Sequence, residues 1–468
     1  MIYFISLGFG ASLTFLILLW KRTCFHNVAE GSIGLVNELL GEADDDVLIK
    51  QIQSSTNKLL IDLFKMFLLI VVAIAIGSIP VVVYCVAISK SISELDLSSL
   101  YSIISISIGA SLPFIIPFNK KSNNGYSELS KLLHRMMLDN YNVAKKLFSI
   151  ESKSITKKGL KTRNDFVVIS GLARAGTTSL MSDLSDLDGF VSLSYANMPL
   201  LTAPNLWRKV YKPKHEKLKE RSHKDGIMIG YNSTEALEEY FFKMMADDDY
   251  IHENYVSEYE LGEEEYYNYL KYQRNIKNDD SKLYLAKNNN FLIRYNSLRQ
   301  YNDDFLLFIL FRDPLTHAAS LMEKHKDYIK LQKEDDFVLE YMDWLGHHEF
   351  GLHQKQFLFN DSTLIEGEKD KIDYWLKIWI NYYSHAIRIN HKNTIFVDYA
   401  NYCSNPTQIV SSIVNKAGLN VNLSELQPFN NRRKSNTEYS KDLLNRAENL
   451  YQELRTKVNP DYFSNTQI

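Results

Sequence analysis

One short segment of the chain combines a guanidinium, two glycines and two hydroxyls at a spacing that suits an anion. Gly171 and Gly176 enclose a loop that contains Arg174, and Thr177 and Thr178 follow directly. The run before the loop is apolar and β-branched, and apolar residues recur at helical spacing after it. A strand, a loop and a helix in this order point backbone N–H groups and a helix amino terminus into one concavity. The segment therefore predicts a binding site for an anionic group.

The loop departs from the nucleotide-binding P-loop at one position. That motif, G-x-x-x-x-G-K-[ST], needs a lysine that reaches the β- and γ-phosphates and a hydroxyl that binds Mg²⁺. The spacing from Gly171 to Gly176 is kept, but Thr177 stands where the lysine belongs. This substitution disfavours a kinase or a GTPase. Arg174 and the threonine hydroxyls remain as donors for a charged group that needs no metal.

A second pair of residues suits a phosphate. Residues 305–311 form a continuous apolar run, as expected of a strand that is buried on both faces. Arg312 follows this run directly, and Ser320 lies eight positions further on, in the next helical pattern. A guanidinium makes paired, charge-assisted hydrogen bonds to a phosphate, and the hydroxyl on the helix adds another.

Together the two motifs resemble the donor site of sulfotransferases that use 3′-phosphoadenosine 5′-phosphosulfate (PAPS), in their bacterial, membrane-associated branch. The family's 5′-phosphosulfate loop has the form [K/R]-[S/A/G]-G-T-T, and its 3′-phosphate site is an arginine at a strand end followed by a serine. The resemblance implies PAPS as the co-substrate, no metal, and transfer of a sulfuryl group to a hydroxyl or an amine. It assigns the 5′-phosphosulfate to Arg174, Ala175, Gly176, Thr177, Thr178 and Ser179, and the 3′-phosphate to Arg312 and Ser320.

The apolar runs predict the elements that position these residues. Runs at 166–170, 283–286, 305–311 and 394–399 are each followed by a helical pattern. This alternation predicts an α/β domain with a mainly parallel sheet and ligands at the carboxyl ends of its strands. The resemblance refines the fold to a P-loop-like sulfotransferase domain.

The sequence offers three candidates for the base that takes the acceptor proton. Glu235 and Glu239 lie four positions apart in a predicted helix, 233–245, and so share a face. The alternative is that these glutamates are merely solvated or cap the helix. His348 lies in a dense group with His347, His353 and the carboxylate of Glu349. This group resembles a segment that is expected to line the acceptor pocket in the bacterial enzymes, and the resemblance makes His348 the runner-up base. The alternative for this group is a structural role, since its spacing does not match the H-E-x-x-H zinc motif.

Two further basic segments resemble parts of the bacterial enzymes. Lys287 begins a Lys-Asn-Asn sequence at the end of a predicted strand, where the lysine is expected to face the sulfate or a bridging oxygen. A surface turn is the alternative. Residues 432–434, Arg-Arg-Lys, resemble a late basic cluster that assists the 3′-phosphate in cytosolic members of the family.

Composition limits the classes of function. The chain has 468 residues, a formal net charge of −3 and three cysteines. The absence of a global basic excess argues against a nucleic-acid partner. Three cysteines cannot form a disulfide framework, and no cysteine or histidine spacing matches a zinc site.

The first part of the chain is much more apolar than the rest. Three stretches, at about 1–20, 66–89 and 101–118, predict membrane-spanning helices, because a span needs roughly 20 apolar residues. The positive charges follow the first stretch, which argues against a secretory signal. For the third stretch, a re-entrant or interfacial segment is the alternative. A helical connector at 121–164 then leads into a catalytic domain at 165–468.

Loop charges predict the orientation. Lysines and arginines concentrate between the first two stretches and after the third. This places residues 21–65, and the chain after about residue 119, on the cytoplasmic side of a plasma or inner membrane. The location agrees with a cytosolic supply of PAPS, which the resemblance implies. With only two spans, the catalytic domain would lie on the opposite face.

The predicted partners are membrane lipids and a lipid, glycan or surface-polymer precursor as acceptor. The basic run 208–224 fits either anionic head groups or plain solvent. Two other functions stay open: a membrane-anchored nucleotide-dependent phosphotransferase or kinase, and a non-catalytic membrane protein that binds PAPS or its product, 3′,5′-bisphosphoadenosine. The sequence does not predict an oligomeric state.

Overall fold

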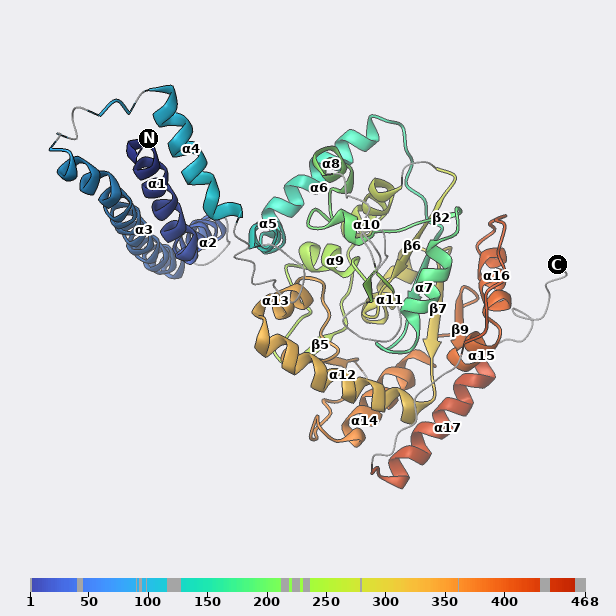
Figure 1. Cartoon of the computed structure of the whole chain (residues 1–468). Coiled ribbons are helices and arrows are strands. Elements are labelled where there is room, and N and C mark those ends of the chain that lie inside the picture. Colours follow the sequence, from blue (N-terminus) through green and yellow to red (C-terminus); the bar gives the residue numbers. More distant parts are fainter. Residues whose placement is uncertain are drawn as a thin grey trace. The chain divides into compact units, whose positions relative to one another are not determined.

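The computed structural model divides the chain into two compact units, Met1–Asn140 and Tyr141–Ile468, and Figure 1 labels their helices and strands. The structure describes residues 2–39, 45–89, 91, 95–97, 99–115, 128–211, 219–220, 228–229, 236–277, 280–360, 362–429 and 438–458.

The first unit is helical. Its helices are α1 Ile2–Trp20, α2 Thr23–Leu39, α3 Asp45–Ala87, α4 Leu100–Ile115 and α5 Glu128–Leu138. By length and composition, α1 and the part of α3 from Gln51 to Ala87 could each cross a membrane, and α4 contains a shorter apolar segment, Leu100–Pro113. The apolar stretch predicted at 66–89 thus lies almost wholly within one helix that begins 21 residues earlier (66 − 45). Residues 116–118 of the third predicted span lie outside the described residues.

Glycines let α1 approach both of its neighbours closely. A Cβ on Gly10 would lie 2.2 Å from the carbonyl oxygen of Gly77 on α3. A Cβ on Gly109 of α4 would lie 1.9 Å from the carbonyl oxygen of Gly8. Only residues without a side chain fit such contacts, which are typical of packed membrane helices.

The contacts of α1 fix the relative directions of its neighbours. Tyr3 lies beside Tyr84, with ring centroids 5.7 Å apart, while Thr14 donates to the Ala73 carbonyl at 3.3 Å, so α1 and α3 are antiparallel. Ser102 lies 3.4 Å from the Tyr3 hydroxyl, and Gly109 lies against Gly8, so α1 and α4 are parallel. The carboxyl ends of α1 and α4 therefore lie at the same end of this unit.

The second unit is built on a five-stranded sheet in the order β2-β6-β1-β7-β9, and every pairing in it is parallel. The strands are β1 Phe166–Ser170, β2 Phe190–Val191, β6 Leu283–Lys287, β7 Leu306–Phe311 and β9 Thr394–Asp398. The predicted α/β class and parallel sheet are confirmed, and the four predicted strands lie within one residue of the observed ones. Two short ladders join β3 Lys219–Glu220 to β4 Met228–Ile229, and β5 Tyr255–Ser257 to β8 Gln356–Leu358.

Helices cover both faces of the sheet. They are α6 Tyr141–Thr156, α7 Thr177–Ser185, α8 Pro204–Val210, α9 Glu239–Ala246, α10 Glu263–Ile276, α11 Tyr295–Tyr301, α12 Pro314–Glu334, α13 Asp336–Trp344, α14 Ile372–Ala386, α15 Tyr399–Ser404, α16 Pro406–Lys416 and α17 Lys441–Lys457, with short 3₁₀ turns at Tyr195–Asn197 and Phe291–Arg294. Val167 and Ile169 of β1 join a core cluster with residues of α7 and α16. Phe166 points the other way and packs edge-on against Tyr269 of α10, as side chains alternate along a strand.

One local prediction differs from the structure. The two prolines of residues 195–207 predict a loop, yet Pro204 is the first residue of α8, because a proline lacks only an N–H that the first helical turn leaves unpaired. Helix α6, which falls in the predicted connector, belongs to the second compact unit.

Candidate active site

The predicted anion loop connects the end of β1 to the start of α7. Its backbone is left-handed at Arg174, with φ 72°, and at Gly176, with φ 100°. A Cβ on Gly176 would lie 2.2 Å from the ring of Tyr399, so this position requires glycine. The loop therefore leads directly into the amino terminus of α7, as the sequence predicts.

The second predicted half-site lies at the end of β7. Arg312 follows the strand, Asp313 caps α12 through the backbone N–H of Thr316 at 2.9 Å, and Ser320 lies two turns into the helix. Arg312 is 7% exposed and Ser320 is fully buried. The Nε of Arg174 donates to the Ser320 hydroxyl at 3.3 Å, across 146 positions of sequence. The fold thus brings the two motifs into one site.

A histidine between Arg312 and Ser320 holds the loop. The fully buried His317 places its Nε2 2.7 Å from the Ala173 carbonyl oxygen, directly before the left-handed residue of the loop. Burial, together with the guanidinium groups of Arg312 and Arg174, lowers the pKa of His317 to about 3, although the hydrogen bond to Ala173 opposes this shift. The imidazole is therefore neutral, and its Nε2 donates to the carbonyl.

Tyr399 closes the other side of the loop. Its ring lies 5.1 Å from the Arg312 guanidinium and against Gly176. Burial raises the pKa of the Tyr399 hydroxyl to about 12, while Arg312 and Arg174 oppose the rise. Both guanidinium groups therefore act on the same ring and on the same imidazole, which gives this pocket a positive potential.

Lys287 adds a third cation. It is the last residue of β6, it is 6% exposed, and its Nζ donates to the Thr178 hydroxyl at 2.7 Å. Because β6, β1 and β7 are parallel neighbours, their carboxyl ends bring Lys287, the loop and Arg312 to one edge of the sheet.

The turn after Lys287 is buried, so the alternative of a surface turn is wrong. The Nδ2 of Asn288 donates to Glu238 at 3.0 Å and to Glu239 at 2.9 Å. The Nδ2 of Asn289 donates to Glu349 at 2.7 Å, and that of Asn290 donates to the Gly346 carbonyl at 3.1 Å. Three consecutive amides thus bind two different segments, one at residues 238–239 and one at residues 346–349, to the edge of the sheet.

Glu239 is not the exposed glutamate that the sequence suggests. It is 2% exposed, and its two oxygens accept from the guanidinium of Arg294 at 2.6 and 2.7 Å. Burial tends to raise the pKa of Glu239, but the charge and hydrogen bonds of Arg294, with a hydrogen bond from Tyr250, outweigh burial and lower it. Glu239 is therefore an ionised member of a buried ion pair. Glu235, the other predicted glutamate, lies outside the described residues.

Glu238, next to it, has the opposite electrostatics. It is 2% exposed and accepts hydrogen bonds from Tyr269 at 2.6 Å, Tyr284 at 3.0 Å and Asn288 at 3.0 Å. Burial raises its pKa despite these donors and the nearby Arg294. The sequence shows two adjacent glutamates and contains no signal that separates their environments.

His348 is buried close to cations. It is 6% exposed, and neither ring nitrogen makes a hydrogen bond. Burial lowers its pKa well below the ordinary value, and Lys243 and Lys355 add to this effect. Its nearest carboxylate is Asp343 at 3.5 Å, which also binds the exposed His353 at 2.6 Å. Among the residues that the structure describes, no group of three His, Cys, Asp or Glu side chains is arranged to hold a metal ion.

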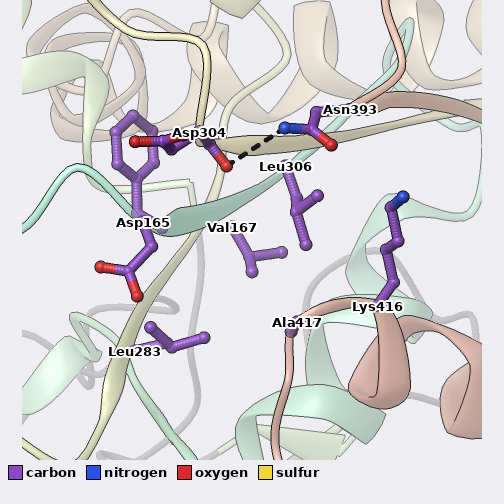
Figure 2. A pocket seen from close by; sticks show the side chains of 9 residues that line it. Asp165, Val167, Leu283, Asp304, Leu306, Asn393, Lys416 and Ala417 are labelled. Carbon is purple, nitrogen blue, oxygen red and sulfur yellow. Dashed lines mark hydrogen bonds between the residues drawn. The ribbon is translucent and has the colours of Figure 1, made fainter.

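A cavity of about 230 Å³ opens at the opposite edge of the sheet, as Figure 2 shows. Its lining includes the first residues of β1, β6 and β7 and two acidic side chains, Asp165 and Asp304. It lies at the amino ends of the strands, so it is separate from the site around Arg174.

Several site residues escape sequence reasoning. His317 and Tyr399 come from two segments, and only the fold brings them to the loop. Glu349 lies in the histidine group that the sequence singles out, but the sequence does not show its contact with the turn after Lys287. His317 had one available signal, since it lies between the two predicted phosphate ligands on one helix. Residues 432–434, the predicted late basic cluster, lie outside the described residues.

Solved structures that resemble this chain include bacterial sulfotransferases. Sulfotransferase STF1 from Mycobacterium tuberculosis is 16% identical, with a TM-score of 0.38 over 74% of this chain and 86% of that chain. STF9 from Mycobacterium avium is 12% identical, with a TM-score of 0.35 over 72% and 81%. A sulfotransferase from Alicyclobacillus acidocaldarius is 12% identical, with a TM-score of 0.28 over 63% and 97%. No protein-family model and no curated protein matches the chain.

Proposed function

We propose that the second unit transfers a sulfuryl group from PAPS to a hydroxyl or an amine. The observation that carries this proposal is the contact between Arg174 and Ser320, because it joins a 5′-phosphosulfate loop to a 3′-phosphate site. One donor molecule with two anionic ends fits two such half-sites better than a single phosphate does.

The residues present fit that donor. Arg174, the backbone N–H groups at residues 176–178 and the hydroxyls of Thr177, Thr178 and Ser179 would hold the 5′-phosphosulfate, and Arg312 with Ser320 would hold the 3′-phosphate. The bound PAPS supplies the sulfuryl group and its leaving phosphate. Lys287, beside Thr178, is placed to stabilise charge on the sulfuryl or bridging oxygens. Such a transfer asks the protein mainly for positioning and for charge stabilisation.

We further propose that the chain is an integral protein of a plasma or inner membrane with its second unit in the cytoplasm. Two helices are long and apolar enough to cross, and the parallel packing of α1 and α4 supports three spans over two. Three spans put the loop after α1 and the chain after α4 on one side. A membrane lipid, a lipid-linked glycan or a surface-polymer precursor is the acceptor that this location favours.

Binding and turnover test the function separately. Calorimetry on the detergent-purified full chain is expected to show binding of 3′,5′-bisphosphoadenosine without a divalent cation. Incubation with ³⁵S-labelled PAPS and membranes from the source organism is expected to label one lipid or glycan fraction. Arg174→Ala should lower this labelling at least about 100-fold, because it removes a charged donor to the leaving group. Arg446→Ala, on the exposed face of α17, is the matched control.

The alternatives give different results. Tight binding of magnesium ATP with no binding of 3′,5′-bisphosphoadenosine would indicate the phosphotransferase or kinase. Binding of PAPS with no labelled product in any fraction would indicate the non-catalytic binding protein. Full activity in Arg174→Ala would refute the assignment of the loop.

A further inference from the structure

The acceptor group has to meet the sulfuryl group beside Lys287. Lys287 contacts the loop through Thr178, and the next residues of the same turn continue along the carboxyl edge of the sheet. The Tyr382 hydroxyl lies 3.2 Å from the Asn289 carbonyl oxygen, to which it donates, and 3.4 Å from the Ser170 hydroxyl at the base of the loop. Tyr382 therefore joins the turn at Asn289 to the end of β1, where the loop begins.

One half of the Asn289 amide has no hydrogen-bond partner within the protein. Its Nδ2 donates to Glu349 at 2.7 Å, whereas its buried Oδ1 has no hydrogen-bond partner. Buried polar atoms are almost always hydrogen-bonded, so an orphaned acceptor in a site calls for a donor from outside the protein. An acceptor hydroxyl or amine supplies such a donor.

Glu349 has a carboxylate oxygen placed for the same ligand. It is 8% exposed, and Asn289 binds Oε1, while Oε2 lies 3.8 Å from His347 Nδ1. That distance exceeds a hydrogen bond, so Oε2 can take a proton. By contrast, the oxygens of Glu239 are bound by Arg294, and Glu238 is enclosed by two tyrosine hydroxyls and an amide.

On the basis of the proposed sulfuryl transfer, we infer that Glu349 takes the proton of the acceptor group and that Asn289 orients it. The acceptor oxygen or nitrogen forms the new bond to sulfur while its proton passes to Glu349. The bond between sulfur and the bridging oxygen breaks, and its electron pair leaves with the 5′-phosphate of 3′,5′-bisphosphoadenosine. This assignment differs from the residues that the sequence suggests, Glu235, Glu239 and His348.

The test compares Glu349→Gln with Glu366→Gln, whose glutamate lies exposed in the loop before α14. With ³⁵S-labelled PAPS and native membranes, Glu349→Gln is expected to lower the transfer rate about 10²- to 10⁴-fold, as loss of a general base does. Its affinity for 3′,5′-bisphosphoadenosine should stay within about twofold of the unmodified chain. Its residual rate should rise with pH, because hydroxide then replaces the missing base. Glu366→Gln should match the unmodified chain.

Other outcomes separate this inference from the proposed function. Transfer by Glu349→Gln within about threefold of the unmodified chain would overturn the role of Glu349 and leave the donor site intact. If that variant fails to bind 3′,5′-bisphosphoadenosine, Glu349→Asp provides the test. With normal binding of 3′,5′-bisphosphoadenosine, partial transfer by Glu349→Asp supports the role of the carboxylate. Full transfer, or no transfer, at normal binding overturns that role. If the unmodified chain itself neither binds nor transfers, the proposed function falls and this inference with it.

Discussion

At the scale of residues, two adjacent glutamates illustrate how burial and partner decide the protonation of a side chain. Glu239 is held ionised by Arg294, whereas Glu238 faces tyrosine hydroxyls and an amide. The pKa of Glu239 is lowered and that of Glu238 is raised. Arg294 therefore favours the charged form of Glu239, whereas burial shifts Glu238 towards its neutral form.

These opposite shifts predict opposite effects of the same substitution. The pKa of Glu239 is lower in the folded state than in the unfolded state. The ion pair therefore stabilises the fold at pH values above the unfolded pKa, and this stabilisation is lost as the pH falls through the folded pKa. Glu239→Gln should therefore cost about 3–5 kcal/mol of stability at pH 7, since it leaves Arg294 buried without a counter-charge. Thermal unfolding of the full chain in detergent measures this as a lower Tm.

Glu238→Gln is the matched variant. Because the pKa of Glu238 is raised, its burial costs stability as pH rises above the unfolded value of about 4.3, and a neutral amide removes that cost. A glutamine can donate to the tyrosine oxygens and accept from Asn288. The Tm of this variant should equal or exceed that of the unmodified chain at pH 8, with a smaller difference at pH 4. Equal losses in both variants would contradict the assignment of separate protonation states.

At the scale of elements, the loop between β1 and α7 depends on backbone shape as much as on its side chains. Gly176 has a left-handed backbone and lies against the Tyr399 ring. An alanine there meets both a strained φ, at about 1–2 kcal/mol, and a clash with an aromatic ring. Gly176→Ala should therefore weaken binding of 3′,5′-bisphosphoadenosine at least about tenfold in calorimetry.

Gly418 provides the control for backbone strain alone. Its φ is 68°, and a Cβ there would meet no atom within 4 Å. Gly418→Ala should lower stability slightly and leave the affinity for 3′,5′-bisphosphoadenosine unchanged. Equal losses of affinity in both variants would show that Tyr399 does not shape the loop.

The elements were predictable from sequence to different degrees. Four of the five strands of the main sheet were predicted because each is a compact apolar run, whereas the two-residue β2 was not. The two proposed donor motifs could be recognised from sequence because the spacing within each is local. The partners of the turn at residues 288–290 could not be predicted, because Asn289 and Glu349 lie 60 positions apart and their pairing depends on the fold. For the same reason, the sequence could not show that Glu239 is buried against Arg294, 55 positions away.

At the scale of the whole molecule, the proposed membrane location would make the helical unit decide on which side the proposed active site lies. The antiparallel packing of α1 with α3 and the parallel packing with α4 are consistent with three crossings. With three crossings, the residues after α1 and the whole second unit share one side. With two crossings, they lie on opposite sides, and cytosolic PAPS could not reach the second unit.

Cysteine labelling distinguishes these arrangements. Cys24, at the start of α2, is half-buried, whereas Cys85 and Cys403 are buried. A membrane-impermeant maleimide is expected to label Cys24 in inverted vesicles and not in intact cells, and Cys24→Ser gives the background. In that background Leu97→Cys, 50% exposed before α4, should be labelled from outside, and Val210→Cys, 83% exposed on α8, from inside. Labelling of Cys24 and Val210→Cys from opposite sides would mean that α4 does not cross, and the proposed cytoplasmic location would fail.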